Sequence, residues 1–141
     1  MAVKAAGINS EDVMVALSRL NNDHVGREFS KEVIRVGSTT SNVLSGDRVC
    51  GIARGAFRAT LYASLTTLMR IPSRMMYAEA AAFPVAFATA QYGIVHLANL
   101  KAGETILIHA VAGAVGRAVI QIAQNKGAIL MATVGSKENN Y

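Results

Sequence analysis

The residues best suited to chemistry form a turn of small side chains, Ala110-Val-Ala-Gly-Ala-Val-Gly116. The turn resembles a dinucleotide-binding fingerprint whose first glycine is replaced, A-x-x-G-x-x-G. Gly113 would let the backbone approach a pyrophosphate, and Gly116 would let a helix pack closely on the preceding strand. The N–H groups at the start of that helix would face the phosphates. Helix packing alone also selects glycine, so the turn by itself leaves a purely structural role open.

The elements around the turn favour the nucleotide interpretation. The sequence predicts a short apolar strand over Thr105–Ala110 and a helix that begins after the turn and ends at Asn125-Lys-Gly127. A second buried strand is predicted over Ala128–Val134. Together these elements make one β-α-β unit of about 30 residues, the usual size. A glycine-rich turn that follows a strand and opens a helix is the context that the fingerprint requires.

The end of the second predicted strand indicates which nucleotide would bind. An NAD-preferring site has an acidic residue about 20 residues after the glycines, on the ribose 2′-hydroxyl. Here the strand leads into Val134-Gly-Ser-Lys137. The Ser136 hydroxyl can bind a 2′-phosphate and Lys137 can neutralise its charge, so NADPH is favoured over NADH. A solvated lysine in a turn is the structural alternative.

The first half of the chain has a more irregular, β-rich pattern. Short strands are predicted over Glu32–Val36 and Arg48–Ile52, the second preceded by a Gly-Asp turn typical of a hairpin. A short helix is predicted over Asp12–Leu20, with Ser10 as its N-cap. A longer helix is predicted over Glu79–Leu100, interrupted near Pro84, which has no backbone N–H to donate.

Composition excludes several classes of function. The 141 residues carry a formal net charge of +5, but the basic residues are scattered and aromatic residues make up only 6%, which argues against nucleic-acid binding. A single cysteine, Cys50, excludes an internal disulfide, fits a reducing, cytoplasmic compartment and is expected to be a small buried hydrophobe. Residues Ala80–Leu100 lack charge, but their polar and alanine content favours a core helix over a membrane span.

Several motifs in order resemble one family. They are Val3-Lys-Ala-Ala-Gly-Ile-Asn9, Leu44-Ser-Gly-Asp-Arg-Val49, Phe83-Pro-Val-Ala-Phe-Ala-Thr-Ala90, Ile108-His-Ala-Val-Ala-Gly-Ala-Val-Gly116 and Ala132-Thr-Val-Gly-Ser136. The chain resembles the enoyl reductase domain of fungal highly reducing polyketide synthases, in the quinone oxidoreductase-like part of the medium-chain dehydrogenase/reductase superfamily. The implied fold is α/β, with a partial GroES-like substrate domain over residues 1–79. The first β-α-β unit of a doubly wound parallel Rossmann domain would follow over residues 80–141. The resemblance implies a chain truncated at both ends.

The resemblance implies an NADPH-dependent enoyl reduction of an α,β-unsaturated thioester. That thioester would be carried on an acyl carrier protein beside other polyketide synthase domains, without nucleic acid or membrane as a partner. The cofactor brings the hydride, and the protein binds, orients and polarises. By position, Asn9 and Thr89 would face the nicotinamide and Ser136 with Lys137 the 2′-phosphate. The pyrophosphate would contact Ala112, Gly113, Ala114, Val115 and Gly116. Tyr92 is a weak catalytic candidate, with a core tyrosine as the favoured alternative.

Two departures from related sequences bear on the site. Zinc-dependent relatives carry Gly-His-Glu where this chain has Gly26-Arg27-Glu28, and no cysteine lies nearby, so a zinc-free site is expected. Family members carry glycine where this chain has Lys31. His96 and His109 are expected to be structural rather than catalytic. Two rival functions remain open: a quinone oxidoreductase-like enzyme acting on free small molecules, and a truncated chain without catalysis.

Overall fold

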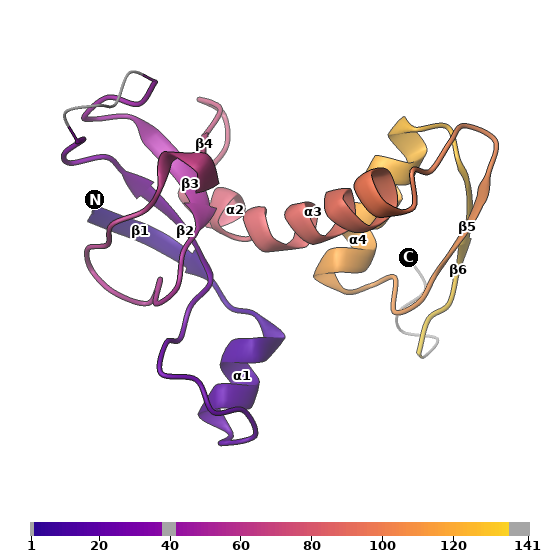
Figure 1. Ribbon diagram of the computed structural model, residues 1–141, viewed down its shortest axis with the longest axis horizontal. Coiled ribbons are helices and arrows are strands. Elements are labelled where there is room, and N and C mark those ends of the chain that lie inside the picture. The colour runs from indigo at the N-terminus through magenta and orange to yellow at the C-terminus, as the bar shows by residue number, and fades with distance from the viewer. Residues whose placement is uncertain (1, 38–41, 136–141) are drawn as a thin grey trace. The chain divides into compact units, whose positions relative to one another are not determined.

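The computed structural model describes residues 2–37 and 42–135 and divides into two compact units, Met1–Val85 and Ala86–Tyr141 (Figure 1). The first unit contains an antiparallel sheet with its strands in chain order. These strands are β1 (Ala2–Gly7), β2 (Glu28–Glu32), β3 (Arg48–Ile52) and β4 (Leu68–Arg70). The predicted strand over Arg48–Ile52 is confirmed.

The strand predicted over Glu32–Val36 is wrong, because β2 runs over Glu28–Glu32. The apolar residues that follow suggest a strand, but the partner strand does not extend beside them. Glu32 pairs with Arg48, the first residue of β3. Val33 then closes the hairpin, since its N–H donates to the Asp47 carbonyl at 2.9 Å and its carbonyl accepts from Gly46 N–H at 2.7 Å. Gly46 has φ +89°, the left-handed backbone that a glycine adopts easily.

The first helix, α1 (Ser10–Ala16), is shorter than predicted and has a different cap. Asn9 is the N-cap, with extended backbone, and Ser10 is already helical, so the prediction of a Ser10 cap is wrong. The Asp12 carboxylate accepts the Asn9 backbone N–H at 2.8 Å, which fixes the start at Asn9. The helix ends before Leu20 because Ser18 has φ +54° and leaves the helical conformation.

The first unit has buried residues on both faces of β2 and β3. Phe29 and Val49 are fully buried, and Cys50 is 4% exposed. Cys50 packs with Ile71 and Ala80, where α2 (Tyr77–Ala81) covers the sheet. The low exposure of Cys50 confirms the expectation of a small buried hydrophobe, and this burial raises the pKa of its thiol.

The predicted interruption of the long helix is confirmed. The helix α2 ends at Ala81, and α3 (Pro84–Ala90) then starts with Pro84 as its first residue, where the missing N–H costs nothing. The π-helical segment η2 (Gln91–Leu97) continues from α3. Within the described residues, no helix is both long and apolar enough to cross a bilayer.

The second unit contains the predicted β-α-β unit. The strands β5 (Thr105–Ile108) and β6 (Ile129–Ala132) run parallel and are joined by α4 (Ala114–Asn125), as Figure 1 shows. Ile108 is buried against α4 residues Ala118 and Val119. On the opposite face of the strands, Leu107 is 55% exposed and its register partner Met131 is 57% exposed. One face of this small sheet therefore carries the core of the unit, and the other is open.

Candidate functional site

The glycine turn in the second unit lies at the carboxyl end of β5 and leads directly into α4. Gly116 is buried, and a Cβ atom there would come within 2.7 Å of the Val111 Cα and carbonyl oxygen. Gly113 is the exposed N-cap of α4, and its N–H donates to the Ala110 carbonyl at 3.0 Å. Gly116 is thus required for close packing of the helix on the turn, as the sequence predicts.

The start of α4 has the properties of an anion site. An α-helix leaves its first N–H groups without partners inside the helix, and their dipoles favour a negative charge. No acidic residue lies in the first turn of α4, and Gly113, Ala114 and Val115 are exposed. The structure brings these three together with Ala112 and Gly116 at one helix end, so the residues present fit a pyrophosphate.

His109 was expected to be structural, and the structure gives it a polar partner at the same edge. Its Nδ1 atom lies 2.9 Å from the Thr133 hydroxyl, which follows β6, and both side chains are exposed. His109 also lines a hollow of about 430 Å³ together with Gly113, Val115 and Ile94. The sequence places His109 directly after a predicted strand. Nothing local in the sequence indicates its contact with Thr133, which lies after the neighbouring strand.

Thr89 and Tyr92 lie on the helical segment of the second unit, Thr89 on α3 and Tyr92 on η2. Both are exposed. The core position favoured for Tyr92 is wrong: its side chain is 58% exposed and stacks on His96, with ring centroids 5.4 Å apart. The segment exposes this edge because its apolar face is formed by other residues, among them Ala90 and Ile94. Ser136 and Lys137 lie outside the described residues.

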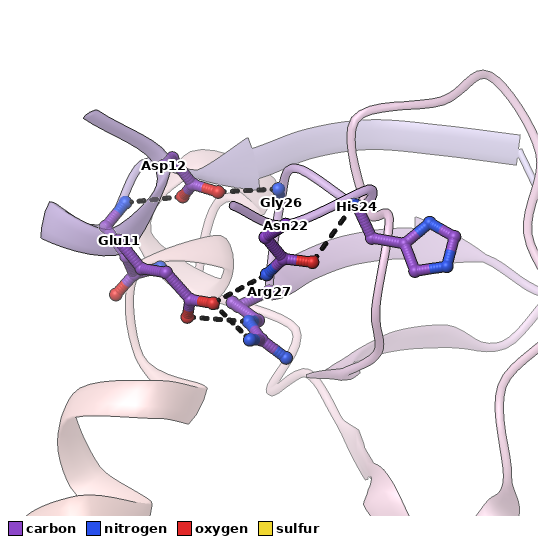
Figure 2. A network of polar contacts seen from close by, with 7 residues as sticks. Glu11, Asp12, Asn22, His24, Gly26 and Arg27 are labelled. Carbon is purple, nitrogen blue, oxygen red and sulfur yellow. Dashed lines mark hydrogen bonds and ion pairs between the residues drawn. The ribbon is translucent and has the colours of Figure 1, made fainter. Parts of the chain in front are cut away.

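Asn9 lies in the first unit, beside a network that connects α1 to the segment before β2 (Figure 2). The Asp12 Oδ1 atom accepts the Gly26 N–H at 2.6 Å. Glu11 forms an ion pair with Arg27 and accepts from Asn22 Nδ2 at 2.8 Å. The residues between α1 and β2 are thereby held to the helix by two adjacent carboxylates.

Arg27 lies directly before β2 and is one half of an ion pair with Glu11. The hydrogen bond from Arg27 holds the pKa of Glu11 below its usual value, and the same contact raises the pKa of Arg27. Among the described residues, no group of three or more histidine, cysteine, aspartate or glutamate side chains could hold a metal ion. The positive charge of Arg27 is neutralised by the carboxylate of Glu11.

Sequence reasoning missed the role of Glu28. This residue begins β2 and is only 4% exposed. Its carboxylate accepts from Asn9 Nδ2 at 2.9 Å and from the Val85 backbone N–H at 2.8 Å. The sequence shows an acidic residue directly after Gly26-Arg27, but it shows neither the burial of that residue nor its two partners, which lie 19 and 57 residues away.

Comparison with known proteins identifies the relatives of this chain. It is 42% identical over 137 residues to a partially reducing polyketide synthase of Talaromyces stipitatus and 41% identical to the squalestatin tetraketide synthase of a Phoma species. These alignments cover 97% and 96% of this chain but 5% of each synthase. The CurK enoyl reductase has the same fold, with a TM-score of 0.92 and 36% identity over 98% of this chain and 46% of that one.

The chain is a homologue of fungal reducing polyketide synthases and has an enoyl reductase fold. The structure of this enoyl reductase homologue also resembles Escherichia coli quinone oxidoreductase, solved with NADPH, with a TM-score of 0.82 and 29% identity over 98% of this chain and 44% of that one. The expected α/β class, with its partial GroES-like and Rossmann parts in the medium-chain dehydrogenase/reductase superfamily, is confirmed. No family model matches the chain. The homologue spans about a twentieth of the synthases and under half of the solved reductases.

Proposed function

We propose that this chain binds NADPH and takes part in enoyl reduction during polyketide biosynthesis. The substrate would be an α,β-unsaturated acyl thioester on an acyl carrier protein, presented by the other domains of a synthase. The observation that carries the proposal is the exposed start of α4, which follows a glycine turn inside a β-α-β unit and has no acid in its first turn. Two solved neighbours, at 26% and 29% identity, contain NADPH.

The proposal divides the chain into a substrate part, residues 1–79, and the beginning of a nucleotide part, residues 80–141. When bound, NADPH supplies the hydride that adds to the β-carbon of the thioester, while the α-carbon takes a proton. The pyrophosphate would be held by the α4 start, Ala112–Gly116. Asn9 and Thr89 would orient the nicotinamide, and exposed Tyr92 remains a candidate for contact with the ligand.

Selectivity for NADPH would come from Ser136 and Lys137, which can bind the 2′-phosphate. Lys137→Ala should weaken NADPH binding by roughly 1–3 kcal/mol, the usual loss for a hydrogen bond to a charged group, and leave NADH binding unchanged. Nucleotide affinity can be measured by fluorescence titration. Lys126→Ala is the matched control, because Lys126 is an exposed cation at the opposite end of α4. Equal losses for both nucleotides in Lys137→Ala would reject the 2′-phosphate role.

The substrate class needs a separate measurement. Consumption of NADPH should be followed with a crotonyl thioester and, in parallel, with a quinone. Reduction of the thioester alone supports the proposal, whereas reduction of the quinone alone would favour an enzyme acting on free small molecules. NADPH binding without turnover of either substrate would support a chain that binds the cofactor without catalysis.

A further inference from the structure

The buried carboxylate of Glu28 makes two directed contacts within the first unit. Its Oε1 atom accepts from the Asn9 side-chain amide, and its Oε2 atom accepts from the backbone N–H of Val85, the second residue of α3. Each oxygen atom of the carboxylate therefore has a hydrogen-bond donor within 2.9 Å. The contacts connect β2 to Asn9, the N-cap of α1, and to the start of α3.

The backbone of β1 is shaped around this side chain. Gly7 is the register partner of Glu28, and a Cβ atom at Gly7 would lie 2.5 Å from the Glu28 Oε1 atom. The same Cβ atom would lie 2.7 Å from the Ala81 carbonyl oxygen. A side chain at position 7 would therefore displace Glu28 from Asn9. The absence of a side chain at Gly7 thus leaves room for the Glu28 carboxylate to reach Asn9.

We infer that Glu28 is a positioning residue that fixes the orientation of the Asn9 side chain. A carboxylate accepts hydrogen bonds and cannot donate them, so only the NH₂ group of Asn9 can face it. The Asn9 Oδ1 atom must then point away from Glu28. The backbone of Asn9 is fixed independently, because its N–H donates to Asp12. Backbone and amide are each held by one carboxylate, which leaves Asn9 little freedom to rotate.

This inference rests on the proposed function, in which Asn9 contacts the nicotinamide. A pre-oriented amide binds a ligand without first losing rotamer entropy, and it presents a defined hydrogen-bonding atom. An Asn9 side chain free to turn over would present donor and acceptor at random. Glu28 would thus act on the cofactor through Asn9 without touching it.

Glu28→Gln tests the inference with almost no change in size. A glutamine has one acceptor oxygen for two donors. The Val85 N–H is part of the backbone and cannot reverse, whereas the Asn9 amide can rotate, so the Asn9 contact should be the one that changes. Glu32→Gln is the matched control, since Glu32 lies on the same strand and is exposed.

The side-chain amide signal of Asn9 and the backbone amide of Val85 can be followed by NMR in the ¹⁵N-labelled 141-residue chain. In Glu28→Gln, the Asn9 amide protons should shift and exchange faster with solvent, while the Val85 amide stays protected. NADPH should bind about tenfold more weakly, because the charge-assisted hydrogen bond that holds the Asn9 amide in its binding orientation is lost. In Glu32→Gln, both amide signals and NADPH affinity should match those of the unaltered chain.

Two results would overturn the inference: an unchanged Asn9 amide in Glu28→Gln, or a changed amide with NADPH affinity equal to that of the unaltered chain. A failure of the proposed function would give a third, different result. If the unaltered chain does not bind NADPH at all, the proposed function fails, and the Asn9 amide signal still decides whether Glu28 orients this side chain.

Discussion

Replacing Lys31 by methionine should stabilise the first unit, because Lys31 places an amine in its core. The residue is completely buried in β2. Among the described residues, its Nζ atom has no hydrogen-bond partner. It lies 4.5 Å from the centroid of the Phe29 ring, a cation–π contact that offsets only part of the desolvation of an ammonium group. Methionine has nearly the same length and no charge.

The pKa gives the size and the sign of the effect. Burial, with a smaller contribution from the positive charge of Arg58, lowers the pKa of Lys31 from 10.5 to about 8. Each pKa unit corresponds to about 1.4 kcal/mol, so the charged form costs about 3 kcal/mol in the folded state. Because the folded pKa is the lower one, the unfolded chain binds more protons between these two values. The free energy of unfolding therefore rises with pH across that window, and below pH 8 the full cost remains.

Urea unfolding followed by circular dichroism at about pH 7 and about pH 10 measures both effects. Lys31→Met should raise the free energy of unfolding by about 3 kcal/mol at the lower pH and by much less at the higher pH. Lys4→Met is the control, because Lys4 lies on neighbouring β1 with 46% of its side chain exposed. If Lys31→Met is no more stable than Lys4→Met at pH 7, or if its advantage is the same at both pH values, the reasoning about a buried ammonium group is refuted.

Two further predictions concern the second unit. Gly116→Ala should lower the free energy of unfolding by roughly 1–3 kcal/mol, because the new Cβ atom would meet the Val111 backbone at 2.7 Å. Gly113→Ala should cost less, since its nearest neighbour would be 3.3 Å away; equal thermal melting temperatures for the two variants would contradict the packing argument. The 141-residue chain should self-associate through the open sheet face around Leu107 and Met131, since parallel strands are normally covered on both faces. Met131→Lys should shift sedimentation toward the monomer, and an unchanged distribution would exclude this face.

The β-α-β unit could be predicted because its signals are local. Three apolar residues in a row follow Thr105 in β5, a turn of small residues comes next, and helical spacing ends at a glycine. The first unit is harder, because its elements depend on distant partners. The apolar run after Glu32 is typical of a strand, yet β2 ends at Glu32, because its partner β3 begins at Arg48. Pairing across the sheet, which local sequence does not encode, sets that boundary.

The residues of the candidate site also differ in whether local sequence can identify them. Gly113 and Gly116 were found from spacing, and the structure places them at the start of α4 as the fingerprint requires. Glu28 could not be found, because its function depends on Asn9 and Val85, which approach it only in the folded chain. The exposure of Tyr92 does not follow from the sequence either, because helical spacing alone does not say which face of a segment the rest of the unit covers.

Arg27 and Lys31 show why residue type alone does not decide what a cation does. Arg27 directly precedes β2, and Lys31 is the fourth of its five residues. Arg27 is half-buried and paired with Glu11, and that contact raises its pKa. Lys31 is fully buried and forms no ion pair with a carboxylate of the described residues, and burial lowers its pKa. The first cation fastens the segment before β2 to α1, and the second weakens the core beneath it. Removing each charge should therefore shift the stability of the first unit in opposite directions.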